Sequence, residues 1–349
     1  MNASSGRRAG GRARWPWSAR AAVLVGVLLA AASGLGFDVG RSRAASTWTQ
    51  WLHLPGVVDV AGPRRDGRLV AEARGRLVLV SSAGRVTPFA PAYSVPEAPE
   101  SYLAVSPGLA VPGAGCRFSR DDVFALDVRG DQPGVTRINA SGAVSRLATV
   151  PGVATLGGIA FDTVGQFGHR LLVAGPSAPG QTQISAIDCR GTVNVVGTVG
   201  TGLEGGMAVA PSGFGAFGGQ LVAANEGNGS IYAVSSRGQL STVAASGVAA
   251  GGDIGVEALG FAPDRAAGAY VADRGTPKNA APHPGTDSVL RLSRRALSAD
   301  GIHQDDLVVA TEGAANGLVV RCARRCVARV VATGPAAAHV EGHVVILAQ

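Results

Sequence analysis

A pattern of four short strands recurs along this chain with a period of about 45–50 residues, which is the signature of propeller blades. The clearest copy reads EGGMAVAP, GQLVAANEG, GSIYAVSSRG and QLSTVAAS over residues 204–246. Similar units cover residues 101–150 and 157–193. Another unit opens as VEALGFAP at 256–263 and continues as GAYVADRG and DSVLRLS to residue 293. Residues 306–334 match the second to fourth strands of the 204–246 unit. We therefore predict an all-β fold, a β-propeller of about six four-stranded blades. A two-layer β-sandwich is the alternative.

The two ends of the repeat region predict how the ring closes. Residues 68–89 supply three strands without a clear first strand, and residues 341–348 (EGHVVILA) look like a first strand with nothing after it. Pairing the N-terminal and C-terminal strands would complete one blade. One strand is hard to find between residues 294 and 305.

The composition agrees with a large all-β core. Hydrophobic residues make up 46% of the chain and charged residues only 16%, and 51 glycines interrupt the short Val/Leu/Ala runs. Disordered chains contain too few apolar residues to form a core, so this hydrophobic content excludes disorder for the body of the chain.

The N-terminus resembles an export signal. Residues 1–20 are rich in arginine and free of acids, and residues 21–37 form an uncharged apolar run. We expect residues 1–37 to be a signal peptide or signal anchor, 38–56 a linker and 57–349 the propeller. Either reading places the protein outside the cell or on its surface, with membrane contact only through an uncleaved N-terminal segment.

The net charge of +7 does not indicate nucleic-acid binding. Five of the arginines lie in the N-terminal segment, and the others are scattered at turns instead of forming a stripe. We expect no nucleic-acid partner.

Four cysteines in an exported chain favour disulfides. If the first strand of every blade runs downward, Cys116 and Cys189 both fall on the lower face of neighbouring blades, and Cys322 and Cys326 flank one hairpin turn. The expected pairs are Cys116–Cys189 and Cys322–Cys326. A zinc site is the alternative, but CxxxC lacks a second close pair.

The same rule gathers acids on the opposite, upper face. Glu100, Glu204, Glu257 and Glu341 each begin a first strand beside the central channel, while Asn225 and Asp273 end second strands on that face, as do Glu226 and Glu312. Oxygen ligands converging from several blades suit Ca²⁺ or another divalent cation. In the alternative, these side chains bind backbone N–H groups at turns or face solvent.

Two further features belong to this face. His339 and His343 flank Glu341 on one short strand, where they could join the site or serve a structural role. Residues 275–286 form a polar insert that could cover the channel.

The units EGGMAVAP…LVAANEGNGSIYAVSSRG and VEALGFAPD…YVAD resemble six-bladed propellers of the SMP-30/gluconolactonase-like and NHL-type group. The resemblance implies a metal at the channel mouth, with Glu204 and Glu257 at the acidic first-strand position. Asn225 and Asp273 lie one strand outward from that family's ligands, and Gly157-Gly158 replaces an expected acid. The stretch 66–86 is also similar to the opening blade of soluble sugar dehydrogenases that use the quinone cofactor PQQ.

These observations define three functional hypotheses. The first is an exported binding or scaffold propeller whose upper face takes a small molecule, a glycan or a protein. The second is a calcium-dependent lactonase with Glu226 or Asp273 as base. The third is a PQQ-type sugar dehydrogenase. No catalytic residue is assigned from the sequence.

Overall fold

The computed structural model describes residues 45–96, 100–128, 132–276, 278–279 and 281–349. The predicted signal segment, residues 1–37, and the first part of the predicted linker lie outside these residues. Among the described residues, no helix has both the length and the apolar character needed to cross a membrane.

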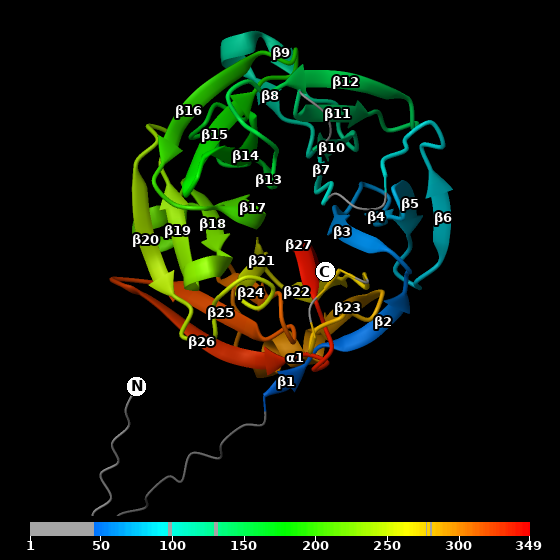
Figure 1. The fold of residues 1–349 in the computed structure, drawn as a ribbon, viewed down its shortest axis with the longest axis vertical. Coiled ribbons are helices and arrows are strands. Elements are labelled where there is room, and N and C mark those ends of the chain that lie inside the picture. The colour runs from blue at the N-terminus through cyan, green and yellow to red at the C-terminus, as the bar shows by residue number, and fades with distance from the viewer. Residues whose placement is uncertain (1–44, 97–99, 129–131, 277, 280) are drawn as a thin grey trace, which may run out of the picture. The chain divides into compact units, whose positions relative to one another are not determined.

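The described chain forms a ring of blades around a central channel (Figure 1). Four blades are separate four-stranded sheets, and a nine-stranded sheet comprises two more blades plus the short strand β1 (Ser46–Thr47), which makes six blades in all. The β-propeller prediction is therefore confirmed.

Four blades follow the chain without interruption, each counted from the innermost strand outward. Blade 1 comprises β3 (Val57–Ala61), β4 (Leu69–Ala73), β5 (Arg76–Val80) and β6 (Val86–Phe89). Blade 2 comprises β7 (Leu103–Val105), β10 (Val123–Asp127), β11 (Gly134–Ile138) and β12 (Val144–Thr149). Blade 3 comprises β13 (Gly158–Phe161), β14 (Leu171–Ala178), β15 (Gln181–Ile187) and β16 (Val193–Val199). Blade 4 comprises β17 (Glu204–Val209), β18 (Leu221–Asn225), β19 (Ser230–Val234) and β20 (Leu240–Ala245).

The burial of the strands explains their composition. Strands β3 and β4 are buried at every position, whereas the outermost strand β6 alternates between exposed and half-buried residues. Inner strands are covered by a neighbouring blade on each side, so they read as continuous Val/Leu/Ala runs without polar alternation. The hydrophobic core accordingly lies between adjacent blades.

Blades 5 and 6 exchange strands. From β21 (Val256–Phe261), the innermost strand of blade 5, the chain passes into blade 6 as β22 (Ala266–Asp273) and β23 (Ser288–Ser293). It returns through the helix α1 (Arg294–Ala299) and completes blade 5 with three further strands: β24 (Leu307–Thr311), β25 (Gly317–Cys322) and β26 (Cys326–Thr333).

The exchange corrects one prediction. Residues 256–293 read as one blade in the sequence, but β21 pairs with β24 and β22 pairs with β27 (Val340–Ala348). The strand that was hard to find near 294–305 does not exist, because this stretch contains α1 and the return to blade 5. The alternation of apolar residues identifies a strand but does not encode its partner.

Both ends of the described chain complete blade 6, so closure of one blade by N-terminal and C-terminal strands is confirmed. Its order from the channel outward is β27, β22, β23 and β2 (Thr49–His53). The predicted partner was wrong, since residues 69–89 have their own first strand, β3. Residues 46–53 were also predicted as linker, yet they form β1 and β2, and Trp48 between them is only 1% exposed.

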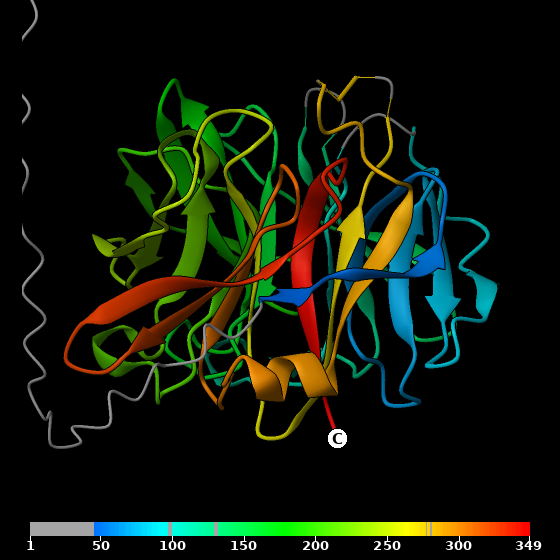
Figure 2. The same cartoon turned by 90° about the horizontal axis from the view of Figure 1, so that it is seen from below.

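The cysteine pairs are as predicted. Cys116 in β9 (Cys116–Arg117) is bonded to Cys189 of the next blade with a Cα–Cα distance of 6.0 Å, and Cys322 is bonded to Cys326 across the β25–β26 turn. Cys189 and Cys322 lie at the ends of strands that run toward the lower face, the face to which the C-terminus points in Figure 2, and their partners lie at the same face.

We predict that replacing Trp48 by alanine lowers the free energy of unfolding by about 3–5 kcal/mol, because it empties a large buried site in the closing blade. Urea unfolding followed by circular dichroism measures the change. Gln50→Ala, at an exposed position on β2, is the control and should change stability by no more than about 0.5 kcal/mol. Equal midpoints for both variants would show that the N-terminal strands do not close the ring.

Candidate functional site

Acidic side chains gather where the innermost strands begin, at the face opposite the C-terminus. We call this cluster the upper mouth; it comprises Glu100, Tyr102, Glu204, Glu226, Asp253, Glu257, Arg274, Glu312, His339 and Glu341. Blades 2, 4, 5 and 6 all contribute to it. The predicted convergence of acids from several blades is therefore observed.

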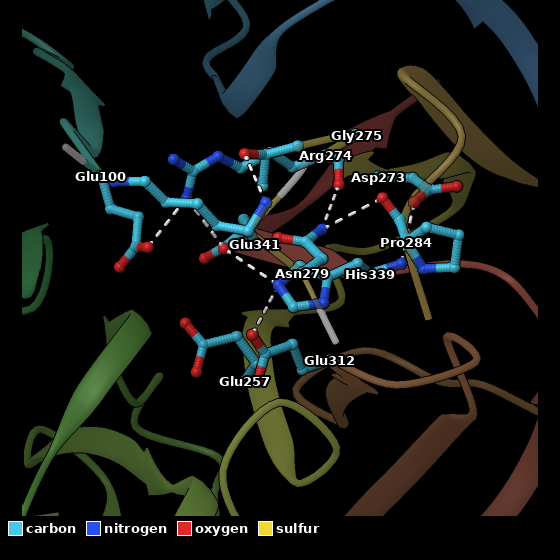
Figure 3. Close-up of polar contacts among 12 residues, drawn as sticks. Glu100, Glu257, Asp273, Arg274, Gly275, Asn279, Pro284, Glu312, His339 and Glu341 are labelled. Atoms are coloured by element: carbon cyan, nitrogen blue, oxygen red, sulfur yellow. Dashed lines mark hydrogen bonds and ion pairs between the residues drawn. The ribbon is translucent and has the colours of Figure 1, made fainter. Parts of the chain in front are cut away.

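Arg274 and Glu341 are buried side chains at the centre of one hydrogen-bonded group in the upper mouth (Figure 3). One guanidinium nitrogen of Arg274 donates to Glu100 at 2.8 Å and to Glu341 at 3.2 Å. The adjacent Glu341 carboxylate, followed by burial, raises the pKa of Glu100 to about 7 against the opposing effect of Arg274. A single cation thus holds two carboxylates together.

Tyr102 links this pair to a third acid. Its hydroxyl lies 2.7 Å from Glu341 and 3.1 Å from Glu257. A hydroxyl has one proton, and Tyr102 uses it to donate a hydrogen bond to the closer Glu341. The contact with Glu257 therefore requires a proton on the Glu257 carboxyl group. Burial, together with the neighbouring carboxylates, raises the pKa of Glu257 well above its usual range, which agrees with a neutral Glu257.

His339 connects the same network to blade 5. Its Nε2 lies 2.8 Å from Glu312 and 3.4 Å from Glu341, and the side chain is 3% exposed. Burial alone lowers the pKa of His339, but the two carboxylates outweigh it and raise the value to about 10. The cluster is completed by Asp253, since one ligand atom each from Asp253, Glu312 and His339 lie within 4.8 Å of one another.

Glu204 and Glu226 lie at the edge of this cluster. Burial and a hydrogen bond with Glu312 raise the pKa of Glu226 to about 8, and one buried oxygen of Glu226 has no partner among the described residues. Burial and the Glu226 carboxylate raise the pKa of Glu204. Without a bound cation, Glu226 keeps a proton that a free carboxyl group would release at neutral pH.

A cavity of about 700 Å³ adjoins the acids. Glu100 and Glu204 line it, together with apolar side chains such as Leu156 and Leu203. A ligand in this cavity would therefore contact both the carboxylates and apolar surface.

Two residues predicted as metal ligands have structural contacts instead. Asp273 is fully buried and accepts hydrogen bonds from the backbone N–H groups of Thr286 and His339, so it fastens the base of the 275–286 insert to β27. The Asn225 side chain caps a short turn and donates to Gly202. Because these polar atoms already have protein partners, we do not include either residue in the cation site.

His343 belongs to a separate network at the floor of the upper mouth. Its Nδ1 donates to Asp59 at 2.9 Å and its Nε2 donates to the Ile159 carbonyl at 2.9 Å. Both partners accept hydrogen bonds, so the ring carries both protons and a positive charge. Burial lowers the pKa of His343, and the Asp59 carboxylate more than offsets this, giving a raised value.

Sequence reasoning missed Tyr102, Arg274 and Asp253. Tyr102 lies two residues after Glu100, and Arg274 directly follows Asp273, so both could have been found by extending the search for polar groups past the first acid. Asp253 lies in the Gly-rich connection before β21, which the same face rule places at the upper mouth.

No protein-family model matches the chain, and no curated protein matches its sequence. Solved structures with a similar fold include a nidogen/laminin complex, at 13% identity and a TM-score of 0.49, covering 84% of this chain and 86% of that one. A catalytically inactive virginiamycin B lyase from Staphylococcus aureus with quinupristin matches at 12% identity and a TM-score of 0.47, covering 86% and 94%. A gluconolactonase-family protein matches at 15% identity and a TM-score of 0.35, covering 72% and 92%. The chemistry of the site is argued below from its own residues.

We predict that Asp59→Asn lowers the free energy of unfolding by about 3–5 kcal/mol, because it leaves the His343 imidazolium without its counter-charge. The loss should be largest below the ordinary pKa of histidine, where the pair is fully charged, and should shrink as pH rises through the raised pKa of His343. Asp66→Asn removes an exposed ion pair with Arg68 and should cost no more than about 1 kcal/mol. Similar urea midpoints for the two variants would contradict the assignment.

Proposed function

We propose that this protein is an exported propeller that binds a divalent cation at its upper mouth and uses the occupied site to hold a ligand on that face. The observation that carries the proposal is the convergence of Asp253, Glu312 and His339, whose ligand atoms lie within 4.8 Å of one another. Export is supported by the signal-like N-terminus and by disulfides, which are rare in cytosolic proteins.

The surrounding charges support a cation. The upper mouth holds Glu100, Glu204, Glu226, Asp253, Glu257, Glu312 and Glu341, against only Arg274 and His339 as cationic partners. The unpartnered oxygen of Glu226 supplies a further donor beside Glu312. A bound cation would neutralise carboxylates that otherwise must keep protons or repel one another.

The donor set narrows the choice of ion. Acids alone suggested Ca²⁺, which takes oxygen ligands, whereas a histidine among carboxylates is typical of Zn²⁺ or Mn²⁺. To act as a ligand, His339 must give up the proton that Glu312 and Glu341 stabilise, so the ion competes with that proton. We therefore propose an ion of the Zn²⁺ or Mn²⁺ type, with Ca²⁺ as the alternative bound through the carboxylates.

After treatment with EDTA, adding the correct ion should raise the melting temperature of the mature protein, and isothermal titration calorimetry should give one site per chain. Glu312→Gln and His339→Gln should each weaken binding by about 10–100-fold or more. Asp264→Asn, which changes an exposed acid in the turn after β21, should leave binding unchanged. Absence of binding by Zn²⁺, Mn²⁺ and Ca²⁺ alike would overturn the proposal.

The raised carboxyl pKa values predict an unusual pH dependence. Between the ordinary value of 4.5 and about 8, Glu226 keeps its proton in the folded chain and loses it in the unfolded chain. Stability without cation should therefore fall as pH rises through this window, since the unfolded chain binds fewer protons. Cation affinity should rise over the same range. Melting curves at pH 5 and pH 8, with and without the ion, test both statements. Glu226→Gln should reduce the difference in melting temperature between the two pH values.

A hydrolase is the second candidate, in which Glu226 acts as a general base instead of as a ligand, since its carboxyl group lies beside Glu312 at the proposed ion site. A bound cation would polarise a lactone carbonyl. Lactone turnover that needs the ion and disappears in Glu226→Gln would support this candidate. We do not propose the quinone-dependent dehydrogenase, because residues 66–86, which carry that resemblance, lie in blade 1, and blade 1 contributes no residue to the upper mouth.

A further inference from the structure

The central channel has a second cavity on the side opposite the acids. His343 and Asp59 bridge the channel between β27, β3 and β13, and below them lies a space of about 580 Å³. We call it the lower cavity. The lower halves of all six innermost strands line it, from β3, β7, β13, β17, β21 and β27.

Apolar side chains and polar groups share the walls of the lower cavity, and its rim is basic. Leu103, Ile159 and Val209 are among the residues of the wall. Arg65 and Arg120 are exposed residues of the rim, and neither guanidinium has a hydrogen-bond or ion-pair partner among the described residues. One acid, Asp121, lies beside them and accepts a hydrogen bond from the Arg65 backbone N–H at 2.8 Å.

A third arginine at the rim has a different role. Arg64 is 8% exposed, donates to the Ala140 carbonyl at 2.9 Å and stacks on the ring of Phe89. The Arg64 guanidinium therefore lies between blades 1 and 2 and does not face the cavity entrance. Arg65 and Arg120 are the cations available at the entrance.

We propose that the lower cavity binds a small organic anion with an apolar body, such as a medium-chain carboxylate. The apolar body would occupy the strand-lined space, and the anionic head would pair with Arg65 and Arg120 at the rim. A volume of about 580 Å³ lies within the range of about 300–1,000 Å³ that holds small ligands. Arginine forks bind carboxylates through paired, charge-assisted hydrogen bonds.

This site is independent of the cation site. The two are separated by the Asp59–His343 bridge and have opposite charge, so the upper mouth attracts cations and the lower rim attracts anions. Failure of one proposal would leave the other intact.

Calorimetry with octanoate, octanol and octylammonium tests the proposal on the mature protein. The folded protein should bind octanoate more tightly than octanol, and octylammonium least. The double variant Arg65→Gln/Arg120→Gln should weaken octanoate binding by about tenfold or more and leave octanol binding unchanged. Arg237→Gln/Arg295→Gln is the control, because these exposed arginines lie on lower-face elements but outside the cavity.

Three outcomes would overturn the inference: no octanoate binding by the unmodified protein, unchanged octanoate binding in the Arg65/Arg120 variant, or loss of octanoate binding in Glu312→Gln. The last result would place the ligand at the upper mouth. Melting curves of each variant exclude unfolding as the cause of a loss.

Discussion

The buried pair of Asp59 and His343 organises the centre of the propeller. In blades 1 to 4 the innermost strand turns one edge toward the channel, where its backbone groups lack a strand partner, whereas β21 and β27 of blades 5 and 6 pair in parallel at one position. The Asp59 carboxylate accepts from the backbone N–H groups of Leu103 and His343, and the His343 ring donates to the Ile159 carbonyl. One ion pair therefore connects blades 1, 2, 3 and 6. The close approach depends on Gly342, which has φ of +68° and whose added Cβ would lie 2.1 Å from an Asp59 oxygen.

The strand exchange between blades 5 and 6 creates the candidate site above that pair. Because β22 and β24 belong to different blades, Arg274 at the end of one and Glu312 at the end of the other lie on either side of the start of β27. Glu341 then pairs with Arg274, His339 pairs with Glu312, and His339 and Glu341 also contact each other. A contiguous blade built from residues 256–293 would have separated these groups, so the site depends on the exchange. Closing blade 6 with both chain ends also resists the opening of the ring at this position, since separating the blade breaks contacts far apart in sequence.

The sequence predicted the fold, the two disulfides and the face on which the acids gather. Each of these depends on strand identity and strand direction, which a repeated pattern of apolar residues and turns determines. It did not predict the partner of β21, the role of residues 46–53 or the structural contacts of Asp273. These features depend on which strand lies next to which, and β21 and β22 are both short apolar runs ending near polar residues. Tyr102 and Arg274 stand beside predicted acids in the sequence and could have been listed as candidates, but only the three-dimensional contacts show that they join acids from different blades.

The concentration of acids at the upper mouth has an energetic consequence. Packing carboxylates into a partly buried cluster raises their pKa values, as for Glu100 and Glu226, and the protein loses stability when they ionise. Arg274 and His339 offset only part of this repulsion, because each is already shared between two carboxylates. A structural role alone would be served better by hydrogen-bonded neutral side chains, which carry no such repulsion. The cationic ligand proposed above would supply the missing charge, and the Asp59–His343 pair below the cluster forms a separately neutralised floor for that site.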